Sequence, residues 1–189
     1  MKRAAHAVAL ALALLGLAQL ASAGWIHAKA RLAQRLIASA WVQVRSGAAA
    51  AHPWPGADLS PIARLTVPAR GVDLYVLDNA AARTLAFGPG LVAGTPAPGG
   101  EGNAVIVAHR DTHFAFLREL ERGDEIDIEG AHGARSRYRV SEASVVDKGE
   151  TEVLDRGRGA KLTLITCFPF DAVLPGTRLR YVVVARRVA

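Results

Sequence analysis

Short runs of alternating or β-branched residues, separated by Gly and Pro, fill the sequence from Ile62 onward. Such runs predict β-strands, because successive side chains of a strand point to opposite faces of the sheet. Between them, only short helical segments are expected, at "AARTLAF" and "FAFLREL". Since an open sheet of this size would expose its edge strands, we predict an all-β domain with a closed or nearly closed barrel. The expected strands cover residues 62–68, 72–78, 104–109, 124–130, 136–146, 161–167 and 178–187.

A strongly apolar segment precedes this domain. After the initial Met-Lys-Arg, no charged residue occurs before Lys29. Two interpretations stay open: an uncleaved membrane anchor of about twenty residues, or a secretory signal that ends at the small residues 21–23. We favour an anchor over residues 1–26, because the uncharged stretch continues to Trp25 and tryptophan is enriched at membrane interfaces. Both interpretations export the rest of the chain.

Residues 27–60 are expected to form an amphipathic helix and a linker, followed by the β-barrel domain over residues 61–189. The helix is predicted to end near residue 45, before a stretch rich in Pro and Gly. We expect its apolar stripe to pack on the domain or on lipid headgroups. The stripe consists of Leu32, Leu36, Ile37, Ala40, Trp41 and Val44.

The basic composition raises the question of an anionic partner. The formal net charge is +6 and the pI is about 10.1. The arginines are scattered, however, and no aromatic or glycine pattern beside them is typical of a nucleic-acid module. The sequence therefore argues against nucleic-acid binding.

Cys167 is the only cysteine, and it ends an apolar, alternating run. Exported proteins usually use cysteines in pairs as disulfides, so a lone thiol is either buried and inert or reactive. A thiol becomes a nucleophile beside an imidazole and a group that stabilises the oxyanion. His109 follows another apolar strand, and Arg178 and Arg180 share one face of the strand after the cysteine. The expected hairpin would bring a guanidinium close to the thiol.

Three motifs here resemble those of the sortase family. "TLITC" matches its Thr-Leu-x-Thr-Cys signature, "VAHRDTHF" resembles its histidine motif, and Arg180, followed by "YVVVA", stands where its arginine is expected. The residues from "TLAFGPG" to the histidine are also similar. One departure is Ala108, where many relatives carry glycine. The resemblance covers most of residues 62–189.

The resemblance implies an eight-stranded sortase-type barrel and a cysteine transpeptidase. Cys167 would attack a backbone carbonyl in a C-terminal sorting signal, often of Leu-Pro-x-Thr-Gly type, and an amine would resolve the acyl-enzyme. His109 would be the acid and then the base, and Arg180 the oxyanion or substrate-positioning group, with Arg178 as a competitor. No cofactor and no metal are expected.

"HRDTHF" and "TCFPFD" most resemble the class GN sortases of Gram-negative proteobacteria, whose partner is typically one dedicated exported protein. We therefore expect a monomer anchored in the inner membrane by a single pass, with its catalytic domain on the periplasmic side. The amine acceptor stays unidentified at this point.

These residues also admit other interpretations. A non-catalytic, membrane-tethered barrel that binds a partner would keep an inert, buried Cys167. The L,D-transpeptidases also use an exported Cys and His, but no Ser-x-Gly-Cys motif surrounds the cysteine. "HRDTH" contains metal-ligand types in His109, Asp111 and His113, but lacks further ligands elsewhere. The acidic group Asp147, Glu150 and Glu152 stands where some sortases have a calcium-responsive loop, and we predict a solvated turn there.

Overall fold

A computed structural model represents the whole chain of 189 residues, and it describes residues 6, 16, 29–155, 159–174 and 176–188. The membrane segment predicted over residues 1–26 therefore lies outside the described residues, apart from His6 and Gly16. Within the described part, no helix has both the length and the hydrophobicity needed to cross a bilayer.

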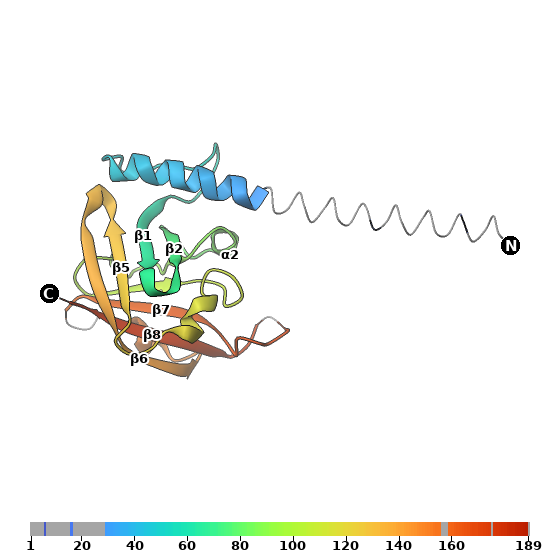
Figure 1. Cartoon of the computed structure of the whole chain (residues 1–189), viewed down its shortest axis with the longest axis vertical. Helices are drawn as coiled ribbons and strands as arrows, with labels where there is room; N and C mark the ends of the chain where they lie inside the picture. Colours follow the sequence, from blue (N-terminus) through green and yellow to red (C-terminus); the bar gives the residue numbers. More distant parts are fainter. Residues whose placement is uncertain (1–5, 7–15, 17–28, 156–158, 175, 189) are drawn as a thin grey trace. The chain divides into compact units, whose positions relative to one another are not determined.

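Residues 37–189 form one compact unit built on a closed barrel of eight strands (Figure 1). The strand order around the barrel is β1-β2-β3-β4-β7-β8-β6-β5, so the predicted closed barrel is confirmed. The strands are β1 (Pro61–Val67), β2 (Val72–Leu77), β3 (Gly90–Leu91), β4 (Asn103–Val107), β5 (Glu125–Gly130), β6 (Arg135–Asp147), β7 (Lys161–Phe168) and β8 (Leu179–Arg187). The helices between them are short: η1 (Pro68–Arg70), α2 (Ala82–Leu85), η2 (Ala115–Glu119), η3 (Ala131–Gly133) and η4 (Thr151–Leu154).

The strand that the sequence pattern missed is β3. It contains two residues, which is too few for an alternating pattern, yet it joins β2 to β4. Gly90 makes this connection possible, because a Cβ at this position would lie 2.2 Å from the carbonyl oxygen of Asn79. The close approach of two backbone segments therefore requires glycine here.

The barrel interior is filled by the inward half of each alternating strand. In β1, for example, buried residues alternate with partly exposed ones along the whole strand. Tyr138 is fully buried and has a partner for its polar atom, because the Gly99 N–H donates to its hydroxyl at 3.1 Å. Other large interior side chains are Leu65, Ile106, Phe114, Leu117, Ile126, Ile128, Leu162 and Leu164.

The outer face of β4, β7 and β8 carries a second apolar cluster. Val105, Ile165 and Val182 alternate with interior residues along their strands and are themselves buried. Val153 and Leu154 of η4 pack against them. η4 therefore covers this part of the outer face of the barrel. By alternation along β7, Cys167 lies on the same outer face.

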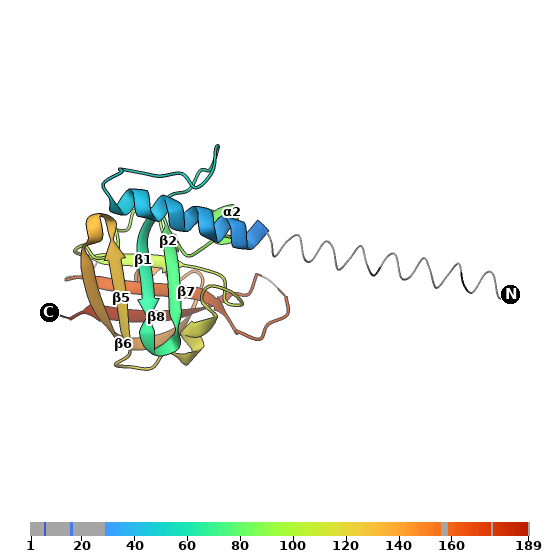
Figure 2. The same ribbon diagram turned by 45° about the horizontal axis from the view of Figure 1, so that its top comes forward.

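A helix covers residues 29–45 of the described chain, and its residues 37–45 belong to the compact unit. Trp41 packs on Tyr75 with ring centroids 6.3 Å apart, and Ile37 contacts Leu59 and Leu77. Figure 2 shows these helical residues beside the ends of β1 and β5. This part of the predicted stripe therefore packs on the domain. Leu32, which was assigned to the same stripe, is 56% exposed.

Candidate active site

β4 and β7 run in parallel, with Val107 opposite Ile165. The pairing continues past β4, because the Ala108 N–H donates to the Ile165 carbonyl at 3.3 Å. In the reverse direction, the buried Thr166 hydroxyl donates to the Ala108 carbonyl at 2.7 Å. One residue further along both segments, His109 comes level with Cys167. Parallel strands end at the same rim of a barrel, and the register of β4 and β7 therefore brings His109 and Cys167 to the same rim.

β7 and β8 are antiparallel, and Cys167 and Arg180 are direct register partners. Directly opposite residues of such a pair point to the same face, with Cβ atoms about 4.5–5.5 Å apart. The Arg180 guanidinium donates through Nη1 to the carbonyls of Thr177 and Leu179, at 2.7 and 2.8 Å. The guanidinium is thus held at the rim next to the thiol.

Arg178, the competitor for this position, is engaged elsewhere. It lies before β8, is exposed, and pairs with Asp147 through Nη2 at 3.1 Å. The Lys148 N–H also donates to its carbonyl at 2.8 Å. Its contacts therefore tie the start of β8 to the turn after β6 and leave the position opposite the cysteine to Arg180.

The residues that carry the thiol and the imidazole both reach the surface. Cys167 is a free cysteine of intermediate exposure, and His109 is exposed. Next to Arg180, η4 and the outer face of β7 and β8 line an open cavity of about 140 Å³. Its lining combines apolar residues with polar and charged ones: Ile165, Val182, Val146, Val153, Leu154, Thr151, Asp147, Lys148, Glu150 and Arg180. Of Cys167, His109 and Arg180, it is Arg180 that lines this cavity.

An aromatic group on the other face supports the end of β7. Phe168 and Tyr181 are stacked with centroids 6.1 Å apart, and Phe170 meets Tyr181 edge to face at 5.2 Å. The Arg118 guanidinium lies 5.8 Å from the Phe170 ring centroid. These contacts hold the end of β7 just after Cys167. Phe168 can make them because neighbouring residues of a strand point to opposite faces, so its ring points away from the thiol.

The histidine segment contains a second imidazole, that of His113. Burial lowers the pKa of His113, the nearby His109 lowers it further, and Asp111 acts in the opposite direction. Burial therefore favours the neutral form of His113. Within the described ranges, no group of three or more His, Cys, Asp or Glu side chains is arranged to hold a metal ion.

The acidic residues before β7 are used in a turn. The Glu150 carboxylate accepts the Asp147 N–H at 2.9 Å, and Asp147 accepts the Gly149 N–H at 3.0 Å. The Gly149 N–H and the Arg178 guanidinium lower the pKa of Asp147. These carboxylates therefore serve hydrogen bonds and an ion pair within the chain.

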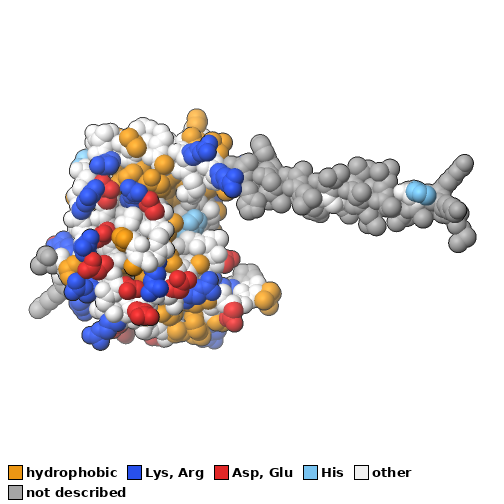
Figure 3. All heavy atoms as spheres, in the orientation of Figure 1, with side chains coloured by type: hydrophobic (Ala, Val, Ile, Leu, Met, Phe, Trp, Pro, Cys, Tyr) orange, Lys and Arg blue, Asp and Glu red, His pale blue; other side chains and the backbone are white. Residues whose placement is uncertain are grey.

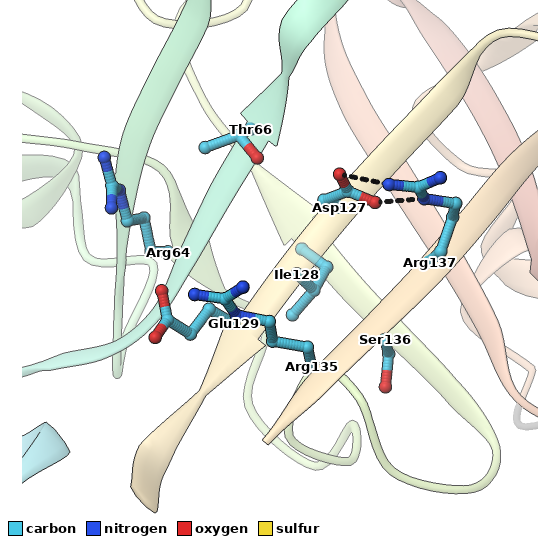
Figure 4. Close-up of a pocket in the computed structure, with 8 residues that line it drawn as sticks. All are labelled: Arg64, Thr66, Asp127, Ile128, Glu129, Arg135, Ser136 and Arg137. Atoms are coloured by element: carbon cyan, nitrogen blue, oxygen red, sulfur yellow. Dashed lines mark hydrogen bonds and ion pairs between the residues drawn. The ribbon is translucent and has the colours of Figure 1, made fainter. Parts of the chain in front are cut away.

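A larger cavity, of about 430 Å³, lies on the outer face of β1, β5 and β6 (Figure 4). Its charged residues pair largely within the chain: Arg137 binds Asp127 through two hydrogen bonds, and Glu129 forms an ion pair, without a hydrogen bond, with Arg45 at 3.1 Å. Figure 3 shows basic and acidic side chains interspersed over one face of the molecule. None of Cys167, His109 and Arg180 lines this larger cavity.

A closed eight-stranded barrel that holds a thiol, an imidazole and a guanidinium at one rim has the parts of a cysteine nucleophile site. The Sortase domain model matches residues 65–188, and the chain therefore belongs to the sortase family. Sortase D of Bacillus subtilis is 30% identical over 66% of this chain. That match spans 62% of the relative, so the chain covers less than two thirds of its length.

Solved structures give the same result for the fold. Sortase A from Corynebacterium diphtheriae has a TM-score of 0.64 and 30% identity, over 71% of this chain and 63% of that one. A Clostridium perfringens Sortase D5 transpeptidase has a TM-score of 0.60 and 26% identity, over 69% of this chain and 80% of that one.

Three residues near the rim were not singled out by sequence reasoning. Thr166 had a detectable signal, because it falls in phase with interior positions, where a hydroxyl needs a partner. Arg110 and Thr177 gave no such signal, since their mutual contact joins two loops that are distant in the sequence.

Proposed function

We propose that this sortase is a cysteine transpeptidase that cleaves a C-terminal sorting signal of an exported protein and transfers the product to an amine. One observation carries the proposal: the partly exposed Cys167 stands directly opposite Arg180, and the register of β4 and β7, continued by two residues, puts His109 level with it. A buried, inert cysteine would suit a binding module, and the partial exposure of this thiol argues against that alternative.

The chemistry assigns one role to each group. The Cys167 thiolate attacks the scissile carbonyl carbon, and the C–N bond then breaks while the His109 imidazolium gives its proton to the departing amine. A thioester remains on the sulfur. An incoming amine attacks this thioester, His109 accepts its proton, and the C–S bond breaks to return the thiolate. The reactive state needs thiolate together with imidazolium, so the two groups titrate as a coupled pair.

Arg180 is suited to hold the carbonyl oxygen as it becomes negative. A guanidinium carries five N–H donors in a planar fork. Nη1 is used by the two backbone carbonyls, and among the described residues the donors on Nε and Nη2 make no hydrogen bond. The two hydrogen bonds of Nη1 fix the guanidinium, and the donors on Nε and Nη2 are available to the substrate.

The substrate proposed is a Leu-Pro-x-Thr-Gly-type signal lying along the cavity between η4 and β7. The apolar side of this cavity, formed by Ile165, Val153 and Leu154, suits aliphatic side chains of an extended peptide. We further propose the class GN subtype, with one dedicated exported substrate. We place the enzyme at the inner membrane with its barrel on the periplasmic side. Support for this location comes from the apolar N-terminal sequence.

Intact-protein mass spectrometry tests the proposal. The full chain, kept in detergent, is incubated with a library of Leu-Pro-x-Thr-Gly-type peptides. We expect a mass increment localised to Cys167, absent in Cys167→Ala and strongly reduced in Arg180→Ala. Arg178→Ala is the matched control, because it removes an exposed arginine two positions away, and it should still form the adduct. An adduct in Cys167→Ala, or none from folded protein whose thiol reacts with iodoacetamide, would contradict the proposal.

A further inference from the structure

Arg110, the residue after His109, is tied to the loop between β7 and β8. Its Nη2 donates to the carbonyls of Ala172 and Leu174, at 2.5 and 3.1 Å, and its Nη1 donates to the Thr177 hydroxyl at 3.3 Å. One side chain of the histidine segment therefore makes three hydrogen bonds to the loop that follows the cysteine.

Thr177 carries the connection onward. Its hydroxyl accepts from Arg110, and its carbonyl accepts from Arg180 at 2.7 Å. Two hydrogen bonds to different atoms of Thr177 thus join the residue beside His109 to the guanidinium opposite the thiol. On the other side of His109, Thr166 holds the Ala108 carbonyl. Hydrogen bonds therefore hold the chain on both sides of His109. Ala108, before the histidine, is held by β7, and Arg110, after the histidine, is held by the loop that follows β7.

Phe170 packs on Tyr181 at the start of this loop, but the described side chains at its tip do little to hold it. Val173 is 95% exposed and Leu174 is 76% exposed, so neither packs into the core. The backbone of the loop contributes a long contact, from the Ala172 N–H to the Pro169 carbonyl at 3.4 Å. Bonds from a charged donor to two carbonyls are stronger than this contact and fix the loop from outside.

The geometry of the contact requires arginine. Two carbonyls and a hydroxyl are bound through two different nitrogens of one planar group. A lysine presents its three donors from a single nitrogen and cannot match this fork. The positive charge alone is therefore not what the position needs.

We propose that Arg110 is a positioning residue for the transpeptidation, and that Thr177 couples the placement of His109 to that of Arg180. This inference rests on the proposed function, since positioning matters only if these groups react. Arg110 itself touches neither the substrate carbonyl nor the thiol in this scheme.

The first arm of the test measures the loop directly by amide hydrogen exchange of the full chain in detergent. We expect Arg110→Ala to speed exchange in residues 171–179 by about tenfold or more, because it removes hydrogen bonds to a charged group. In Arg110→Lys, the loop should exchange as fast as in Arg110→Ala. In Thr177→Val, the exchange rate should increase by a smaller factor. Arg122→Ala, which removes another exposed arginine, is the control and should leave the loop unchanged.

The second arm measures kcat and KM with a peptide that forms the Cys167 adduct. We expect Arg110→Ala and Arg110→Lys to lower kcat about tenfold to a hundredfold, with KM changed less than threefold. The reason is that His109 and Arg180 would be misplaced, while the contacts that bind the peptide would remain. Thr177→Val added to Arg110→Ala should cost little more, since both act through one path. Thermal melting confirms that each variant is folded.

The outcomes separate this inference from the proposed function. Unchanged loop exchange in Arg110→Ala would overturn the network, and so would normal kcat despite faster exchange; in either case the transpeptidase proposal would stand. If the unaltered enzyme forms no acyl-enzyme, the proposed function fails and the positioning role fails with it. Full recovery of kcat by Arg110→Lys would also overturn the inference, since charge alone would then suffice.

Discussion

Thr166→Val isolates the bond that holds the histidine segment to β7. Thr166 is 2% exposed, and its hydroxyl donates to the Ala108 carbonyl at 2.7 Å. Valine keeps the shape of the side chain and suits a strand, but it leaves a buried carbonyl without this donor. Leaving such an acceptor unsatisfied costs about 1–3 kcal/mol. With a urea m value of about 1–3 kcal/mol/M, the denaturation midpoint should fall by roughly 1 M.

The effect on activity should exceed the effect on stability. Because the lost bond fixes the residue before His109, we expect kcat for acyl transfer to fall about tenfold or more under conditions where the variant is fully folded. Thr84→Val is the matched control. Thr84 is fully buried, and its hydroxyl donates to Asn79 at 2.7 Å. It belongs to α2, which contains none of Cys167, His109 and Arg180. It should lose stability and keep kcat.

Equal kcat losses in the two threonine variants would refute this reasoning, because a general loss of stability would then explain both. An unchanged midpoint in Thr166→Val would refute it as well, since the hydrogen bond would contribute nothing to the folded state. Urea denaturation and single-turnover kinetics on the same preparations decide between these outcomes.

Three further predictions concern the thiol, a titration and the backbone. Iodoacetamide should label Cys167 in the folded protein, and His109→Ala should change the pH dependence of the labelling rate; an identical profile would exclude an interaction between the two groups. Because the pKa of His113 is lowered from 6.5 by burial, the unfolded chain binds more protons just below that pH, so stability should fall as the pH decreases through 6.5. His113→Gln should remove that part of the dependence, measured by urea midpoints at pH 5 and 7.5. Gly90→Ala should lower the free energy of unfolding by about 1–3 kcal/mol or more, because its Cβ meets the Asn79 carbonyl; a midpoint equal to that of the unaltered chain would show that the two segments can separate freely.

Much of the barrel was predictable because its strands alternate in polarity. Residues 62–68 were predicted as a strand, and β1 spans Pro61–Val67 with strict alternation of burial. The strand Gly90–Leu91 was not predicted. Its pairing depends on a close approach of two backbone segments, which a pattern of side-chain polarity does not reveal. "FAFLREL" was correctly placed as a short helix, which in the structure is the 3₁₀ helix η2.

The site was predictable to the extent that strand ends determine it. Cys167 and His109 each follow an apolar run, and Arg180 belongs to the strand that returns from the cysteine. The choice between Arg178 and Arg180 needed the register, because two residues on one face cannot be distinguished by alternation. The Arg110 contacts needed the loop path as well, which no local pattern encodes.

The order of strands explains why these three groups gather at one rim. β7 lies between β4, which is parallel to it, and β8, which is antiparallel. A residue just past the end of β4 and a residue near the start of β8 must therefore both come to the end of β7. Side-chain alternation then selects which residue of β7 faces outward with them. A one-residue insertion between Leu164 and Cys167 would turn the thiol toward the interior and leave Arg180 and His109 in place. The position of the cysteine in "TLITC" is thus fixed by the pleat of β7, and the chemistry proposed for the rim depends on that register.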